Sequence, residues 1–283
     1  MIERQSWLKV TSHLVLVIGA LLVISPLYLA LVASTHSAQD MAQSPVPIWF
    51  GSHAWDNYGQ ILGGNVPGMS NQIPVSQMLW VSLVMALLIP AGKIVISLMS
   101  AFAIVYFRFP WRMGVFWAIF VTLMLPVEVR ISPTYKVVAD LGMLNTYAGL
   151  TIPLIASATA TFLFRQFFMT IPDEFVEAAK MDGAKPMRFF WDILLPLSRT
   201  SIAALFVIQF IYGWNQYLWP LLISTDENMY PVVMGIRRLI GGGDAQIEWN
   251  VVMATAVLAM LPPALVVMLM QKWFVKGLVD SEK

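Results

Sequence analysis

Apolar residues gather along the chain in six long stretches, separated by shorter polar segments. The stretches cover residues 14–33, 78–106, 113–132, 147–168, 200–223 and 251–272. A helix of about 20 mostly apolar residues is long enough to cross the hydrocarbon core of a bilayer. The pattern therefore predicts an all-α integral membrane protein with six transmembrane helices, in which residues 1–283 form a single transmembrane domain.

The positions of the basic residues predict how these helices are oriented. Twelve of the 17 basic residues lie at the N-terminus, near the second-to-third and fourth-to-fifth connections, or at the C-terminal end: Arg4, Lys9, Arg108, Arg112, Arg165, Lys180, Lys185, Arg188, Arg199, Lys272, Lys276 and Lys283. Residues 34–77 contain no Lys or Arg. Because cytoplasmic loops are enriched in these residues, both termini are expected in the cytoplasm, with 34–77 as the first outer loop.

The first apolar stretch has one alternative interpretation, a cleaved signal peptide. Its apolar run is longer than the 7–15 residues of a signal-peptide core, and five further stretches follow it. These features favour a retained membrane anchor.

Composition supports a membrane protein and excludes several functional classes. Hydrophobic residues make up 58% of the chain and charged residues 12%, against about a quarter charged in soluble domains. The chain has no cysteine, which excludes disulfides, thiolate metal sites and a cysteine nucleophile. The three histidines, His13, His36 and His53, lack metal-ligand spacing, so no metal site is predicted. A net charge of +1 without a basic patch gives no sign of nucleic-acid binding.

Residues 169–199 form a polar segment on the predicted cytoplasmic side. Asp173 and Glu174 follow Pro172, as expected for the first turn of a helix. We expect Ala178 and Ala179 to form a small surface beside the Glu177 carboxylate. A partner could approach this surface closely and supply a basic side chain. An amphipathic helix lying on the inner leaflet is the alternative, but such helices usually combine basic and bulky apolar residues.

The same segment carries a spaced motif that identifies a family. The pattern is Glu-Ala-Ala, three residues, Gly, nine residues, Ile-x-Leu-Pro, and its residues here are Glu177, Ala178, Ala179, Asp182 (within the first gap), Gly183, Ile193, Leu195 and Pro196. It resembles the signature loop of ABC importer permeases, the EAA motif, at the place where that family carries it. The resemblance implies the type I importer permease fold, with a permease core at about 77–272 and a coupling loop at 169–199 that contacts the ATPase.

Other stretches narrow the resemblance. Residues 56–58, 214–222 and 274–278 resemble the second permease of maltose-type carbohydrate importers, and 100–105, 123–130, 162–169 and 277–283 resemble that of sn-glycerol-3-phosphate importers. The resemblance implies import of sn-glycerol 3-phosphate, with glycerophosphodiesters or a neutral sugar as alternatives. The tail Asp280-Ser281-Glu282-Lys283 departs from the glycine- and lysine-rich tails of maltose-type relatives, so tail contacts with the ATPase are not carried over.

The resemblance also implies an assembly in the bacterial inner membrane. Its members would be a heterodimer with a sister permease, two copies of an ABC ATPase and a binding protein outside the membrane. The chain lacks a Gly-x-x-x-x-Gly-Lys-Ser/Thr loop. It is therefore expected to be non-catalytic and to bind no cofactor itself, with ATP and Mg²⁺ on the partner ATPase.

Three charged residues fall inside predicted spans: Lys93, Glu128 and Arg130. A charge at the membrane centre is costly and needs a reason. Either these residues line the translocation path, where Lys93 or Arg130 would offset the charge of a phosphate, or they form ion pairs between helices, such as Lys93 with Glu128. Both interpretations stay open from the sequence.

The second outer loop contains a candidate contact for the binding protein. Its residues are Arg237, Arg238, Gly241, Gly242 and Gly243, of which the glycines indicate a mobile tip by composition. For the two arginines, a solvated basic pair is the alternative.

Three rival functions explain less of the sequence. An ion-coupled secondary transporter usually has buried acids or paired broken helices, whereas Glu128 is the single plausible intramembrane acid here. A membrane enzyme would need a nucleophile with a base, or a metal cluster. Neither of these, nor a passive scaffold, would explain the spaced loop motif.

Overall fold

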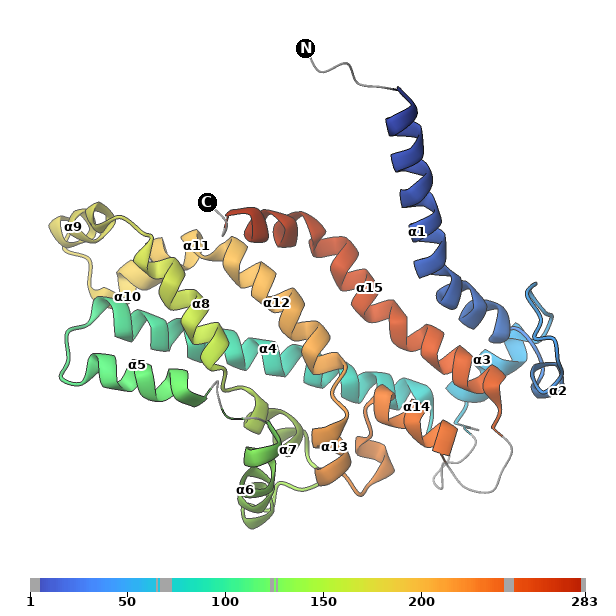
Figure 1. The fold of residues 1–283 in the computed structure, drawn as a ribbon. Coiled ribbons are helices and arrows are strands. Elements are labelled where there is room, and N and C mark those ends of the chain that lie inside the picture. The colour runs from blue at the N-terminus through green and yellow to red at the C-terminus, as the bar shows by residue number, and fades with distance from the viewer. Residues whose placement is uncertain are drawn as a thin grey trace. The chain divides into compact units, whose positions relative to one another are not determined.

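The computed structural model describes residues 6–64, 66, 73–122, 125, 127–241 and 247–280, and for 6–8, 127, 128 and 273–280 it describes the backbone alone. Within these residues all regular structure is helical, which confirms the all-α prediction. In chain order the elements are α1 Ser6–Ala33, α2 Ala38–Met41, α3 Ala54–Leu62, α4 Val75–Tyr106, α5 Arg112–Val121, α6 Val127–Asp140, α7 Tyr147–Thr151, η2 Ile152–Leu154, α8 Ala158–Met169, α9 Asp173–Met181, α10 Pro186–Phe189, η3 Phe190–Leu194, α11 Leu195–Leu197, α12 Arg199–Trp214, α13 Leu218–Ile223, η4 Glu227–Met229, α14 Val232–Gly241 and α15 Trp249–Asp280 (Figure 1).

Three of the six apolar stretches form single helices long enough to cross a membrane. They are Lys9–Ala33 within α1, Val75–Tyr106 in α4 and Trp249–Lys272 within α15. Two further candidates are bent helix pairs, Tyr147–Leu154 with Ala158–Met169, at 47°, and Pro186–Leu197 with Arg199–Trp214, at 70°. The described residues thus contain three to five candidate spans, and the arrangement with six stays a prediction.

The remaining stretches are interrupted where local chemistry favours a break. In the fourth stretch, η2 contains Pro153, and the hydroxyl of Ser157 accepts a hydrogen bond from the Ala160 amide, which starts α8 as a new helix. The fifth stretch divides into α12 and α13. In the third, α5 has only ten residues, and α6 begins at Val127, directly after Pro126 in the sequence.

The chain forms two compact units, of which the first comprises Met1–Gln77 and Gly235–Leu261. Asn57 of α3 is the polar centre of this unit. Its buried side-chain amide donates hydrogen bonds to the carbonyl oxygens of Ser34 (2.9 Å) and His36 (2.8 Å). Its Oδ1 accepts one from the Asn250 amide of α15 (2.9 Å). Asn57 therefore joins the end of α1, α3 and the start of α15.

Most apolar side chains of α1 are exposed, among them Val15, Leu22 and Val23. Only 11% of its most apolar segment, within Lys9–Ala33, is buried against the rest of the chain. In a membrane protein, such a surface is in contact with lipid or with another subunit.

The second unit comprises Met78–Met234 and Pro262–Lys283, and two apolar clusters are seen among its described residues. One joins α4, α8, α9, η3 and α12 through buried residues that include Phe102, Phe164, Phe190 and Leu205. The other joins α4, α6, α7 and α13, where the Trp219 indole donates a hydrogen bond to the Gly149 carbonyl (2.9 Å). The predicted coupling loop is part of the first cluster.

Candidate functional site: the coupling loop and the membrane charges

The predicted coupling loop lies between the end of α8 at Met169 and the start of α12 at Arg199. Its first helix, α9, has Asp173 and Glu174 in the first turn and Lys180 in the last, each placed favourably for the helix dipole. Figure 1 shows α9 beyond the ends of α8 and α10, at one extremity of its unit.

The structure corrects one expectation about α9, because Ala178 and Ala179 do not form a common surface. Ala178 is exposed, whereas Ala179 is buried in the cluster that contains Phe164 and Phe190. Neighbouring residues on a helix point about 100° apart, so one small residue faces outward while the next lets α9 pack closely on its own unit. The outward surface consists of Glu174, Glu177, Ala178 and Met181, all of which are exposed.

Glu177 presents an exposed carboxylate on this outward surface. In the part of the chain that the structure describes, it takes part in no ion pair. Met181, beside it on the same surface, is 87% exposed. Together, Glu177, Ala178 and the exposed side chain of Met181 offer a negative charge and an apolar contact to a partner.

Gly183 ends α9 in a left-handed conformation, with φ = 70°. The Gly183 amide donates to the Lys180 carbonyl (3.0 Å), and the Ala184 amide donates to the Ala179 carbonyl (2.9 Å). These two bonds define a Schellman motif, in which a glycine is favoured at the left-handed position. The sequence motif therefore places its glycine where the backbone requires one.

The second part of the loop, Pro186–Leu197, contains a π-helical turn, η3. Within it the Leu195 amide donates to the carbonyl of Phe190, five residues earlier. A proline in an α-helix clashes with the carbonyl four residues before it, and the wider turn makes room just before Pro196. At the break that follows, the buried Ser198 hydroxyl donates to the Leu194 carbonyl (2.7 Å). The loop thus enters α12 through a 70° bend.

Aromatic rings fix the second part of the loop to the ends of two membrane helices. The ring centroid of Phe190 lies 5.1 Å from that of Phe102, and the centroid of Phe189 lies 5.3 Å from that of Tyr106. The Tyr106 hydroxyl donates to the Phe168 carbonyl (3.3 Å), linking α4 to α8. We call these five residues the aromatic cluster. The motif itself does not include Phe102, Tyr106 or Phe168. The spacing of four residues between Phe102 and Tyr106, which places both rings on one side of a helix, is the sequence feature that could have indicated this cluster.

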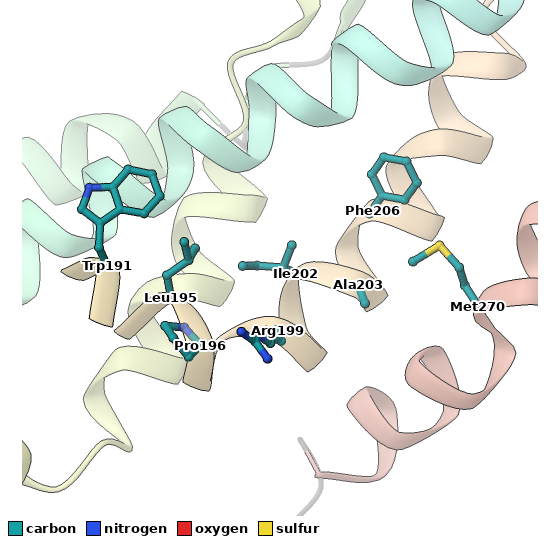
Figure 2. Close-up of a pocket in the computed structure, with 8 residues that line it drawn as sticks. All are labelled: Trp191, Leu195, Pro196, Arg199, Ile202, Ala203, Phe206 and Met270. Atoms are coloured by element: carbon teal, nitrogen blue, oxygen red, sulfur yellow. The ribbon is translucent and has the colours of Figure 1, made fainter. Parts of the chain in front are cut away.

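Leu195 and Pro196 of the motif line an open groove of about 570 Å³. Figure 2 shows Leu195, Pro196 and Arg199 along the bend between α11 and α12, with Met270 of α15 near Ala203 and Phe206. Ile193, in contrast, packs against the buried cluster inside the unit. Asp182 is exposed at the end of α9. The motif therefore divides into residues that hold the loop together and residues that face outward.

Lys93 is buried, at 6% exposure, and its partners come from α12. Its Nζ donates to Oε1 of Gln209 (2.7 Å) and lies 3.9 Å from the centroid of the Tyr212 ring. Neither partner was singled out from the sequence, although Gln209 is a polar residue within an apolar run. A charge at the membrane centre costs about 2.5–3.5 kcal/mol. A hydrogen bond to a charged group contributes about 1.5–3 kcal/mol, and a desolvated cation–π contact about 2 kcal/mol. The free energy of these two contacts is therefore large enough to offset the cost of placing the lysine there without an ion pair.

Arg130, on α6, is exposed and close enough to Lys93 for the two positive charges to interact. The side chain of Glu128 lies outside the described residues, so its pairing with Lys93 stays a prediction.

The outer-loop candidates lie on or after α14. Arg237 and Arg238 are both exposed, and Gly241 is the last residue of this helix. Gly242 and Gly243 lie outside the described residues. Contact with a binding protein stays a prediction for all five.

Comparison with known proteins gives one family for the whole chain. Residues 93–280 match the family described as "Binding-protein-dependent transport system inner membrane component". The chain is 58% identical to the sn-glycerol-3-phosphate transport system permease protein UgpE of Pectobacterium atrosepticum, 57% to that of Agrobacterium fabrum and 56% to that of Brucella melitensis, in each case over 100% of both chains.

A solved structure supports the fold independently. A chain from the crystal structure of a bacterial ABC transporter involved in the import of the acidic polysaccharide alginate superposes with a TM-score of 0.78 at 22% identity, covering 97% of this chain and 99% of that one. At this identity the likeness concerns the fold. With the family match and the full-length relatives, it confirms the resemblance seen in the loop motif: the chain belongs to the family of inner membrane permease components of binding-protein-dependent transport systems.

Proposed function

We propose that this permease carries sn-glycerol 3-phosphate across the bacterial inner membrane, as part of an importer driven by ATP hydrolysis on a partner subunit. The observation that carries the proposal is the identity of 56–58% along the entire chain to permeases named for that substrate. Relatives that share this much sequence over their whole length usually share their substrate class. Glycerophosphodiesters and neutral sugars are the alternatives that the experiment below separates.

As an inner membrane component, the chain is a non-catalytic transmembrane subunit, and membership in the family implies ATPase and binding-protein partners. We place it in a heterodimer with a sister permease, with two ATPase copies that bind ATP and Mg²⁺. The exposed apolar surface of α1 is consistent with burial against such a sister subunit or lipid.

Six spans with both termini in the cytoplasm remain the proposed topology. Support comes from the absence of Lys and Arg in residues 34–77 and from their concentration in the coupling loop and near the termini. In this arrangement the short α5 and the start of α6 together supply the third crossing.

The outward surface of α9 is proposed to dock in a cleft of the ATPase, with Glu177 pairing to a basic residue there. ATP binding would draw the two ATPase subunits together and move α9 with them. The permease pair would then change from inward-facing to outward-facing, and the docked binding protein would release its ligand. Two structural features support this role: the carboxylate is free of intramolecular ion pairs in the described chain, and Ala178 leaves room for close approach.

The test of the substrate is uptake into proteoliposomes that hold the complete importer, with and without this subunit. We expect uptake of sn-glycerol 3-phosphate that requires this chain, the binding protein and ATP. If uptake is absent while the binding protein still stimulates ATP hydrolysis, the transporter class stands and the substrate assignment is wrong. A panel of glycerophosphodiesters and sugars would then identify the cargo.

The docking role is tested with two variants on the outward surface of α9. Ala178→Trp adds bulk at an exposed position, and Glu177→Arg reverses the charge; both should leave the permease pair assembled and reduce recovery of the ATPase at least about tenfold. Asp140→Arg, the same reversal at an exposed acid that ends α6, is the control. Unchanged ATPase recovery and uptake in both α9 variants would show that this surface is not the docking site.

A further inference from the structure

A lysine without a described counter-ion lies at the middle of the membrane domain. Lys93 is 18 residues from the start of α4 at Val75 and 13 from its end at Tyr106. Gln209 follows Arg199, the start of α12, by ten residues, or about 15 Å along a helix. The hydrocarbon core is about 30 Å thick, so this contact falls close to its centre.

The described groups around Lys93 carry no negative charge that compensates its own. Gln209 offers a neutral amide oxygen at 2.7 Å, and Tyr212 offers the face of its ring at 3.9 Å. The nearby charge of Arg130 is also positive. Among the side chains that the structure describes, no acid lies within ion-pair distance of Lys93. Summed over the described side chains, the charge beside Lys93 is positive, and such a charge would attract an anion.

The two partners of Lys93 are less buried than the lysine itself. Lys93 is buried, but Gln209 is only partly buried and Tyr212 is 39% exposed. To reach the lysine, a ligand would have to pass the Tyr212 ring and displace the Gln209 amide. Displaced from the lysine, the Gln209 amide is available to hydrogen bond with a hydroxyl group.

We infer that Lys93, held by Gln209 and Tyr212, is the residue with which this permease binds the phosphate group of its substrate at the centre of the membrane. A phosphate monoester carries a charge of about −1.5 to −2 at pH 7, which matches the two positive charges of Lys93 and Arg130. A neutral sugar would gain nothing from these charges. The inference rests on the proposed function and deepens it, because it assigns selectivity for phosphate to the permease in addition to the binding protein.

The decisive variant is Gln209→Glu, which keeps the size of the side chain and places a carboxylate beside Nζ. An internal ion pair would satisfy Lys93 structurally and compete with the phosphate. We expect the complex to assemble, the binding protein to stimulate ATP hydrolysis, and uptake of sn-glycerol 3-phosphate to fall at least about tenfold. Gln166→Glu, the same change at an exposed position on α8, is the control and should transport like the parent.

Two variants of Lys93 test whether its positive charge is needed for uptake of the phosphate substrate. Lys93→Arg keeps the charge and should retain uptake, whereas Lys93→Met removes it. The ratio of Lys93→Met uptake to parent uptake should fall as the pH rises from about 5 to 7, because the second phosphate proton dissociates near pH 6. Both complexes use the same binding protein, so its own pH dependence cancels in the ratio.

Several results would overturn the inference. Parent-like uptake by Gln209→Glu, or a Lys93→Met ratio that does not change with pH, would make Lys93 a structural residue. If Lys93→Met fails to assemble and an added Glu128→Gln restores assembly, the lysine belongs to an ion pair between helices. Failure of the proposed function is distinguishable, since the parent complex itself would then not transport sn-glycerol 3-phosphate.

Discussion

Gly183 offers a quantitative test of the coupling loop, because its structural role is confined to the backbone. Its φ of 70° lies in the left-handed region, yet a Cβ at this position would meet no atom within 4 Å. Substitution therefore costs the conformational term alone, about 1–2 kcal/mol for an ordinary residue and less for asparagine. That free energy lowers the population of the Schellman end of α9 relative to frayed states by about 5- to 30-fold.

The assay is uptake and ATPase recovery for Gly183→Asn, Gly183→Ala and Gly183→Val in the complete importer. We expect activity to fall in the order Gly, Asn, Ala, Val, since asparagine tolerates the left-handed conformation and β-branched residues do not. If the ATPase crowded this position instead, asparagine would be worse than the smaller alanine. That reversed order, or full activity with valine, would refute the backbone argument.

Three further predictions concern packing and protonation. Gly213→Ala should destabilise the permease by about 1–3 kcal/mol in thermal unfolding, because a Cβ would lie 3.0 Å from the Ala86 Cα of α4, where backbone cannot yield as a side chain does. Asn57→Leu should cost a similar amount, measured in the same way, because it leaves two carbonyls and one amide unpaired. Hydrogen bonds from Ser37 hold the pKa of the Asp40 carboxyl below its ordinary value. These bonds should therefore stabilise α2 at any pH above the ordinary pKa of an aspartate, and the stabilisation should be lost as the pH falls through the lowered pKa of Asp40. Hydrogen exchange of the Asp40 amide should show this loss, and Ser37→Ala should remove it.

The loop and its motif were predictable because their signals are local. A run of polar residues with acids in its first turn and a glycine after its last predicts a helix and its end from sequence alone. The structure has α9 at Asp173–Met181 and the left-handed turn at Gly183. The three long helices follow equally directly from apolar length, since α1, α4 and α15 need no knowledge of their neighbours.

Other features depend on which surfaces meet, and the sequence does not state this. The assignment of Ala178 and Ala179 to one surface failed because the side of α9 that packs inward is set by Phe164 and Phe190, on other elements. Adjacent residues point about 100° apart on a helix, so two of them share a surface only where that surface is broad. The contact between Lys93 and Gln209 could not be predicted from a local pattern, because 116 residues separate the two in the chain.

The contacts of the loop also indicate how a movement of α9 would reach the membrane helices. The loop is continuous with α12, but that connection passes through a π turn and a 70° bend rather than along one straight helix. The aromatic cluster, in contrast, brings Phe189 and Phe190 into direct contact with Tyr106 and Phe102 of α4. Phe102 lies nine residues after Lys93 on the same uninterrupted helix. We propose that a shift of the loop is passed to α4 by these packed rings. Because α4 also carries Lys93, the rings would link the proposed ATPase-docking loop to the proposed phosphate contact.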